Sequence, residues 1–191
     1  MTTILDRVYP AGIISDIVAQ HLRIPEDAEV LHANACMCVR NAFDVAEAYT
    51  NRIIVDSLVT FHFEEVDTRI ELPTAPVKEV EEVRYRHTDG EWRTLDSSAY
   101  QLVSDAHRAY IIISEQLAFT TNQGPRIEVS VRCGYDEDGD YALPGSIRQA
   151  IMLMAGTFNS FEGDAQVGSV AELPMSARYL LSHYRILPYG G

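Results

Sequence analysis

At 191 residues, the chain is long enough to form one compact domain with extended appendages. It is 47% hydrophobic and 23% charged, which excludes wholesale disorder and makes a metal or disulfide staple unnecessary for folding. Its formal net charge of −13 argues against a protein that grips nucleic acid, because such proteins present clustered Lys and Arg.

The three cysteines, Cys36, Cys38 and Cys133, lack the spacing of a secreted disulfide framework. They are typical of small buried side chains in a reducing compartment. The sequence opens with no basic-then-apolar leader, and no apolar run approaches the roughly 20 residues that cross a bilayer. We therefore expect a soluble protein, made in the cytoplasm, that does not contact membranes.

The first predicted elements form a helical pair. Ser15 can cap a short helix that runs to His21, and Pro25 separates it from a longer helix over 29–49. In the longer helix the apolar residues recur at alternating intervals of four and three, which places them on one face. These residues are Leu31, Ala35, Cys38, Ala42, Val45 and Tyr49.

Residues 52–136 change to the periodicity of strands. β-Branched and aromatic residues alternate with polar ones, and Asp89-Gly90 is a hairpin signal between two of the runs. The last run alternates strictly and predicts a half-solvated strand. The predicted strands cover 53–55, 59–63, 69–72, 80–86, 91–95, 100–103, 110–113 and 127–133. Together they predict a small antiparallel β unit.

Helix returns after Pro144, a residue suited to a first helical turn. The helix that follows is apolar almost all round, so it is either the central core helix or meets another subunit. We expect a flexible linker over 163–172 and a short helix after Pro174. The apolar residues on one face of that last helix are Ala177, Leu180, Leu181 and Tyr184.

The predicted fold class is α+β: an N-terminal helical pair, a small antiparallel β unit, an apolar core helix, a linker and a C-terminal docking helix. We expect the main domain over 1–162, with the β insertion at 52–136. A flexible linker and C-terminal arm would then occupy 163–191.

Catalytic patterns are missing from the sequence. It has no GxSxG elbow, no phosphate-binding loop, no GxGxxG fingerprint and no HExxH pair, and its six histidines are scattered. The acidic stretch 136–140 could hold a hard cation, but it fails the calcium-loop pattern. A solvated loop before a helix is the favoured interpretation, so we expect no cofactor, no metal and no catalytic residue.

A series of short motifs occurs in a recognisable order. The motifs are EAYTNR at 47–52, LPTAPV at 72–77, DGEW at 89–92, YQL at 100–102, VSVRCGY at 129–135, PGSIRQAI at 144–151 and LLSHYR at 180–185. Their order resembles the head–tail connector (adaptor, or head-completion) proteins of tailed bacteriophages, which also occur in gene transfer agents. The resemblance spans residues 14–187. The acidic loop 136–140 departs from it by being longer and more acidic.

This resemblance implies a structural virion protein, located in the neck between capsid and tail after assembly in the host cytoplasm. It implies a homo-oligomeric ring, commonly of twelve subunits, that docks on the portal protein and extends the DNA channel. A stopper or tail-completion protein would bind next, and double-stranded DNA would pass through without specific binding. The alternatives are another neck component, such as a stopper or tail-completion protein, a small metal-dependent hydrolase, or a module that binds a small ligand.

Three sets of residues are candidates for assembly. The portal-docking set is Leu180, Leu181, Tyr184 and Arg185. The subunit-interface set is Met152, Leu153 and Phe158. The channel-lining acids are Asp136, Glu137, Asp138 and Asp140, whose negative potential would repel phosphates. The competing interpretation of the last helix is that it packs on its own domain.

Overall fold

The chain folds as a β unit and a helical unit, each built from two stretches that are separated in the sequence. The β unit comprises the N-terminal strand and Asp56–Gly134, and the helical unit comprises Tyr9–Val55 and the chain from Tyr135 onward. The computed structural model describes residues 2–65, 67–105, 107–114, 117, 124–161 and 173–186. The predicted linker and the predicted boundary at 162/163 lie outside the described residues and stay predictions.

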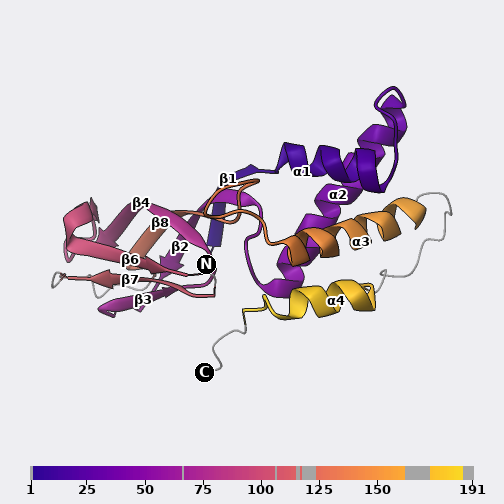
Figure 1. The fold of residues 1–191 in the computed structure, drawn as a ribbon. Coiled ribbons are helices and arrows are strands. Elements are labelled where there is room, and N and C mark those ends of the chain that lie inside the picture. Colours follow the sequence, from indigo (N-terminus) through magenta and orange to yellow (C-terminus); the bar gives the residue numbers. More distant parts are fainter. Residues whose placement is uncertain are drawn as a thin grey trace. The chain divides into compact units, whose positions relative to one another are not determined.

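The β unit contains two antiparallel sheets (Figure 1). A five-stranded sheet has the order β1-β2-β8-β4-β5, and a three-stranded sheet has the order β3-β7-β6. The strands are β1 (Thr2–Val8), β2 (Asp56–Phe63), β3 (Arg69–Leu72), β4 (Val77–Arg86), β5 (Trp92–Thr94), β6 (Tyr100–Ser104), β7 (Ala109–Ile113) and β8 (Ile127–Cys133). The predicted antiparallel β unit is therefore confirmed, but the predicted strand at 53–55 is wrong, because Val55 forms only an isolated bridge, with Tyr135, and β2 begins after it.

The strand β8 lies at the centre of the larger sheet, between β2 and β4. Its residues Ile127, Val129, Val131 and Cys133 are fully buried, while the intervening polar residues are half-buried. This alternation follows from the two-residue repeat of a strand, which sends successive side chains to opposite faces. The face that carries the buried residues is the core of the β unit.

The strand β1 was not predicted, because the sequence at 2–8 shows no strand pattern. It pairs antiparallel with β2 and forms the edge of the larger sheet, with an irregularity between Ile4 and Asp6. Six of its seven residues are exposed. This strand therefore forms because it pairs with a neighbouring strand, and its own sequence has no hydrophobic alternation that would predict it.

The helical unit consists of α1 (Ala11–Asp16), the π-helical turn η1 (Ile17–His21), α2 (Glu29–Thr50), α3 (Gly145–Phe161) and α4 (Met175–Ser182). The predicted helices after Glu29, Pro144 and Pro174 are confirmed. The predicted cap at Ser15 is wrong, because α1 begins four residues earlier, after Pro10, and Ser15 lies inside it. Among the described residues, no helix combines the length and apolarity needed to cross a membrane.

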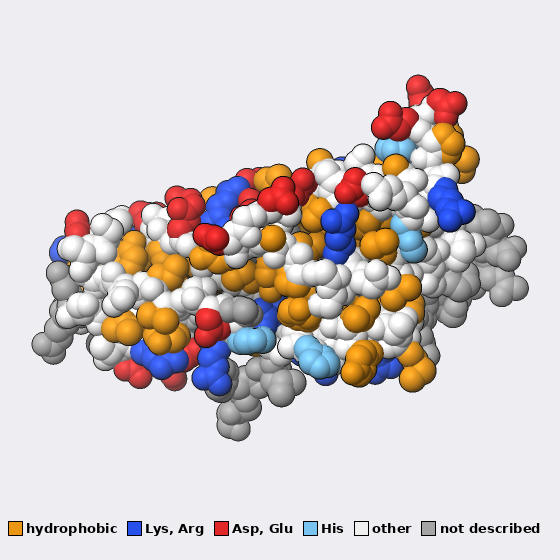
Figure 2. Space-filling model, viewed as in Figure 1, with side chains coloured by type: hydrophobic (Ala, Val, Ile, Leu, Met, Phe, Trp, Pro, Cys, Tyr) orange, Lys and Arg blue, Asp and Glu red, His pale blue; other side chains and the backbone are white. Residues whose placement is uncertain are grey.

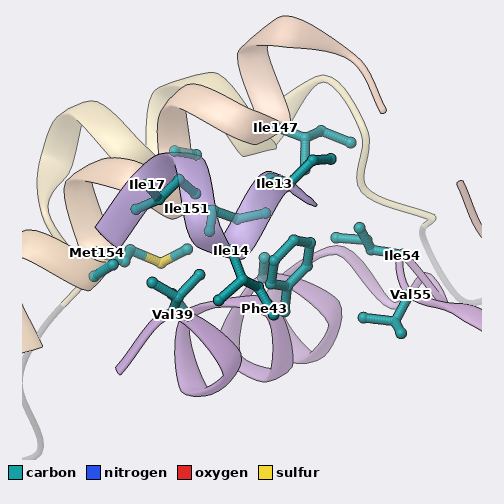
Figure 3. Packing of buried hydrophobic residues seen from close by; sticks show 14 of the residues in the cluster. Ile13, Ile14, Ile17, Val39, Phe43, Ile54, Val55, Ile147, Ile151 and Met154 are labelled. Carbon is teal, nitrogen blue, oxygen red and sulfur yellow. The ribbon is translucent and has the colours of Figure 1, made fainter. Parts of the chain in front are cut away.

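The core of the helical unit lies between α1, α2 and α3 (Figure 3). Ile14 of α1, Phe43 of α2 and Ile151 of α3 all point into it and are at most 5% exposed. The helix α3 packs against both α2 and α4, which explains why it is apolar on more than one side. It is the central core helix, which was one of the two predicted alternatives.

Candidate functional site

The last helix, α4, is seated in the core of its own unit. Leu181 is 0% exposed, as is Ala177 one turn earlier, while Leu180 and Tyr184 are partly buried against the same core. The Tyr184 hydroxyl also lies 2.7 Å from the Ser146 hydroxyl at the start of α3. Of the predicted portal-docking residues, Leu181 therefore presents no side chain to a partner while the helix stays in place.

The chain after α4 is held by the end of α2. Asn51 adopts a left-handed conformation with φ of 53° and ends α2, and its side-chain amide donates to the Ile186 carbonyl (3.1 Å). The Ile186 N–H donates to the Thr50 carbonyl (2.8 Å), and Arg52 Nε donates to the Tyr184 carbonyl. Three consecutive residues at one helix end thus fix where this part of the chain leaves the helical unit.

Arg185 belongs to the same held segment but remains exposed. Its guanidinium lies 5.2 Å from the centre of the Tyr49 ring, within range of a cation–π contact. Of the four predicted docking residues, Arg185 is the one that is exposed. The hydrogen bonds on either side of it, at Tyr184 and Ile186, keep its position defined.

The outer face of α4, defined as Met175, Arg178, Tyr179 and His183, was not predicted as a site. Met175 is 87% exposed and Tyr179 is 72% exposed, and the Tyr179 ring contacts the His183 ring edge-on at 5.8 Å. Large apolar side chains at this level of exposure, clustered on one side of a helix, are typical of surfaces that bind other proteins. The spacing of three and four residues between them is the only signal in the sequence.

The first turn of α2, with the loop before it, forms a second apolar surface. Val30 is 74% exposed and Leu31 is 60% exposed, and Glu26, Asp27 and Glu29 beside them are exposed carboxylates. We call these five residues the α2 tip. Figure 2 shows acidic and hydrophobic side chains together at this end of α2. Further along the helix, Met37 is 58% exposed.

The predicted subunit-interface residues lie on α3. Met152, Leu153 and Phe158 are half-buried, and all three pack against the core of their own unit. Part of each side chain remains accessible to a neighbour. Their packing against the core explains most of why these positions of α3 carry apolar residues.

The acidic loop is a structured turn joining β8 to α3. Its hydrogen bonds run from the Asp136 N–H to the Tyr141 carbonyl (2.8 Å) and from the Leu143 N–H to the Asp136 carbonyl (2.9 Å). Glu137 Oε1 accepts a hydrogen bond from the Gly12 N–H in the first turn of α1 (2.8 Å). One of the four predicted channel-lining acids therefore anchors a helix, although its side chain is exposed.

The other three acids differ in exposure. Asp136 is half-buried, whereas Asp138 and Asp140 are exposed. Across the part of the chain that the structure describes, no group of three His, Cys, Asp or Glu side chains is placed to hold a metal ion. The acidic loop thus shows no arrangement that would activate water through a metal.

A shallow pocket of about 390 Å³ lies beside β3. Its lining consists of Phe63, Glu65, Asp67, Arg69, Ile70 and Glu71. These residues offer carboxylates and one guanidinium, but no serine, cysteine or histidine that would act as a nucleophile with its base. The pocket therefore does not support acyl-transfer chemistry.

The face of the larger sheet opposite its core carries paired charges. Asp56 accepts hydrogen bonds from Lys78 Nζ (2.8 Å) and Arg132 Nη2 (2.9 Å), and these three side chains are 13–28% exposed. Further along the same three strands, Glu128 of β8 lies 3.2 Å from His62 of β2 and 3.5 Å from Arg84 of β4. In both clusters, partly buried groups of opposite charge lie next to one another, which offsets their desolvation.

No protein-family model matches this chain. No curated protein matches it either. Solved structures of gene transfer agent (GTA) particles do contain chains of the same fold. One, in the neck of an empty GTA particle computed with C6 symmetry, has a TM-score of 0.76 and 20% sequence identity, over 100% of this chain and 98% of that chain.

Two further chains match over nearly their whole length. One belongs to the virion of a native GTA particle (TM-score 0.73, 21% identity, covering 100% of this chain and 98% of that one). The other belongs to the neck of a native GTA particle computed with C12 symmetry (TM-score 0.68, 20% identity, covering 99% and 98%). These likenesses establish the fold, and at that level they confirm the resemblance seen in the order of the sequence motifs.

Proposed function

We propose that this chain is a structural component of the neck of a tailed-phage virion or gene transfer agent particle, and not an enzyme. The observation that carries the proposal is the whole-length match of fold, in which both units and their interleaved order recur in chains from neck structures. A fold by itself hosts many functions. The lack of a metal-binding group among the described residues and the exposed apolar helix faces support an assembly role over a catalytic one.

Within the neck, we assign the chain to the adaptor, as a homo-oligomeric ring that docks on the portal protein and extends the DNA channel. The neighbours' neck structures were computed with C6 and C12 symmetry, which supports a ring of twelve subunits. A closed ring of identical chains requires two different surfaces on each subunit, because each subunit contacts one neighbour on either side. The far side of the ring would bind a stopper or tail-completion protein.

The ring assignment can be tested with particles made without this chain. If it is the adaptor, heads should accumulate without tails, and the purified chain should restore tail attachment to those heads. Electron microscopy before and after addition gives the readout. Normal tailed particles in the absence of the chain would contradict a neck role, and heads that bind it only after a portal-bound protein is added would favour a stopper or tail-completion role.

Portal docking is assigned to the segment that the end of α2 holds. Arg185 is its exposed charge, while Leu180, Leu181 and Tyr184 fix the helix before it. Removing residues 173–191 would take two core side chains with them, so a point change is the better test. Arg185→Glu should weaken binding to purified portal about tenfold or more, which corresponds to a loss of about 1.4 kcal/mol.

The matched control is Arg108→Glu, which makes the same change at an exposed arginine of the β6–β7 turn. Surface plasmon resonance on immobilised portal would report both affinities. An Arg185→Glu variant that binds portal as tightly as the wild type does would remove Arg185 from the docking surface. A similar loss in both would point to a general effect of charge.

Two further assignments complete the proposal. Met152, Leu153 and Phe158 contribute their accessible parts to contacts between subunits, and Asp136, Glu137, Asp138 and Asp140 line the DNA channel. Changing Asp138 and Asp140 to Asn removes two charges without touching the Glu137 bond to α1. Slower DNA release from particles carrying this double variant would support the lining role, because repulsion of phosphates keeps DNA mobile. Unchanged packaging and release would contradict it.

A further inference from the structure

The core-facing stripe of α2 continues past the core of its own unit. Ala35, Cys38 and Ala42 lie on this stripe and are 0–3% exposed. Leu31 falls on the same stripe, one helical turn earlier, but it is 60% exposed. Together with Val30, which is 74% exposed beside it, this leucine forms a contiguous apolar surface of the kind that marks protein–protein contacts.

The α2 tip combines this apolar surface with negative charge. Glu26, Asp27 and Glu29 flank Val30 and Leu31, and all five are exposed. A partner for the tip should therefore offer apolar side chains together with positive charge and no carboxylates. Complementary charge of this kind selects the partner and its orientation more than it adds affinity.

The outer face of α4 has this composition. Met175 and Tyr179 supply exposed apolar area, and Arg178 and His183 supply the basic groups. Residues 173–186 contain no Asp or Glu, in a chain with 28 acidic and 15 basic residues. Figure 2 shows hydrophobic, basic and histidine side chains over this helix. The two surfaces are thus complementary in both apolarity and charge.

These surfaces cannot meet within one subunit. The helix α2 has 22 residues and is therefore about 33 Å long, and its far end, at Thr50, holds the chain that leaves α4. Figure 1 shows the α2 tip on one side of α3 and α4 on the other. Two different complementary surfaces on one chain produce a head-to-tail contact, which closes into a ring when the rotation between neighbours divides a full turn.

We infer that the α2 tip of one subunit packs on the outer face of α4 of the next copy of this chain, and that this contact joins neighbours in the ring. The inference rests on the proposed ring and names the surfaces that build it. Val30 and Leu31 lie against Met175 and Tyr179, and the carboxylates of the tip face Arg178 and His183. Portal docking through Arg185 uses the chain after α4, beyond the outer face.

The test uses two full-length variants that each break one surface. Leu31→Asp places a charge in the tip, and Tyr179→Asp places one in the outer face of α4; both positions are exposed, so the fold should persist. Each variant alone should lose self-association by at least about tenfold. Mixed in equal amounts, they should form a 1:1 dimer that grows no further, because one intact tip and one intact α4 face remain in the pair.

Native mass spectrometry across a concentration series gives the stoichiometry, and circular dichroism verifies the fold. Ala48→Asp is the matched control, since it adds the same charge at an exposed position near the other end of α2 and should associate like wild type. A mixture that stays monomeric while the wild type and the control associate would overturn the inference. So would a wild-type chain that does not self-associate at any concentration reached.

A photo-reactive benzophenone side chain at position 31 locates the contact directly. In a mixture of isotope-labelled and unlabelled chains, cross-links between copies should fall on residues 175–183. Rings whose cross-links fall elsewhere would leave the ring proposal standing and overturn this choice of surfaces. If the chain binds portal but never cross-links to a second copy, this inference fails while the neck proposal survives.

Discussion

In the β unit, the sheet face opposite the core is covered by paired charges, whereas in the helical unit two helices present exposed large apolar side chains. Asp56 with Lys78 and Arg132 represents the first pattern, and Leu31 and Tyr179 represent the second. The exception in the β unit is the edge strand β1, where Ile4, Leu5 and Val8 are 49–59% exposed. The comparison indicates that the sheet face satisfies its charges within the unit, whereas the exposed apolar faces of the helices are typical of surfaces that bind another molecule.

The two units can be followed separately in one unfolding experiment. Trp92 is the chain's single tryptophan and lies in β5, so its fluorescence reports on the β unit. The far-ultraviolet circular dichroism signal at helical wavelengths reports mainly on the helical unit. The two signals therefore distinguish a loss of stability in one unit from a loss in the other.

The largest effect is expected within α4, where burial and exposure alternate. Leu181→Ala should lower the free energy of unfolding of the helical unit by about 2–5 kcal/mol, because it leaves a cavity at a fully buried position. Tyr179→Ala, two residues away and 72% exposed, should change it by no more than about 0.5 kcal/mol. Urea titration followed by circular dichroism checks both values. Equal losses in the free energy of unfolding would mean that Tyr179 is packed in the core, so the outer face of α4 would not be exposed to a partner.

The second effect concerns the paired charges of the β unit. Asp56→Asn removes the charge that binds both Lys78 and Arg132, and it should lower the stability of the β unit by about 1–3 kcal/mol. The control is Glu71→Gln, because its pair with Arg69 is 42–47% exposed and should contribute less than about 1 kcal/mol. Trp92 fluorescence during urea unfolding measures both. If Asp56→Asn costs no more than Glu71→Gln, the paired face does not stabilise the sheet.

A third prediction tests the anchor between the acidic loop and α1. A methyl group at Gly12 would lie 2.4 Å from Glu137 Oε2, so Gly12→Ala must displace that carboxylate and weaken its bond to the backbone. Gly12→Ala should lower the free energy of unfolding by about 1 kcal/mol more in the wild type than in a Glu137→Ala background. Gly145→Ala meets nothing within 4 Å and should be insensitive to that background. If the effects of Gly12→Ala and Glu137→Ala on stability are additive, the hydrogen bond between Gly12 and Glu137 does not stabilise the start of α1.

The smallest effect is expected in the β6–β7 turn. Hydrogen bonds from the backbone N–H groups of His107 and then Arg108 hold the pKa of Asp105 below its usual value of 3.8. Because the folded pKa is the lower one, the stabilisation is complete above the unfolded pKa and is lost as pH falls through the folded value. An NMR titration should show the Asp105 carboxyl and both amide protons shifting together below pH 3.8. Titration at or above the usual value would contradict these bonds.

Much of the fold was predictable because its periodicity is local. The alternation in 127–133 predicted a half-solvated strand, and β8 has this pattern with the same bounds. The spacing in 29–49 predicted the long helix, which extends one residue further. By contrast, β1 depends on pairing with β2, whose partner residues lie 48 to 59 positions further along the sequence, and the start of α1 depends on packing, so local sequence patterns revealed neither.

The candidate surfaces were less predictable for a physical reason. Helical spacing places Leu180 and Leu181 on an apolar face, but it does not reveal whether that face meets the core or a partner. The structure shows that Leu181 is buried and that Met175 and Tyr179, on the opposite side, are exposed. It also shows that Glu137, predicted as a channel-lining acid, bonds to Gly12, 125 residues away in the sequence.

Hydrophobic periodicity is set residue by residue, so the class of fold and most of the helices and strands, in their order, can be inferred from the sequence. Which apolar side chains remain exposed depends instead on tertiary packing, since burial depends on how far each helix extends past its neighbours. Leu31 is an example: the helical spacing of the sequence places it on the apolar stripe of α2, but it is exposed because the core of the unit ends before it.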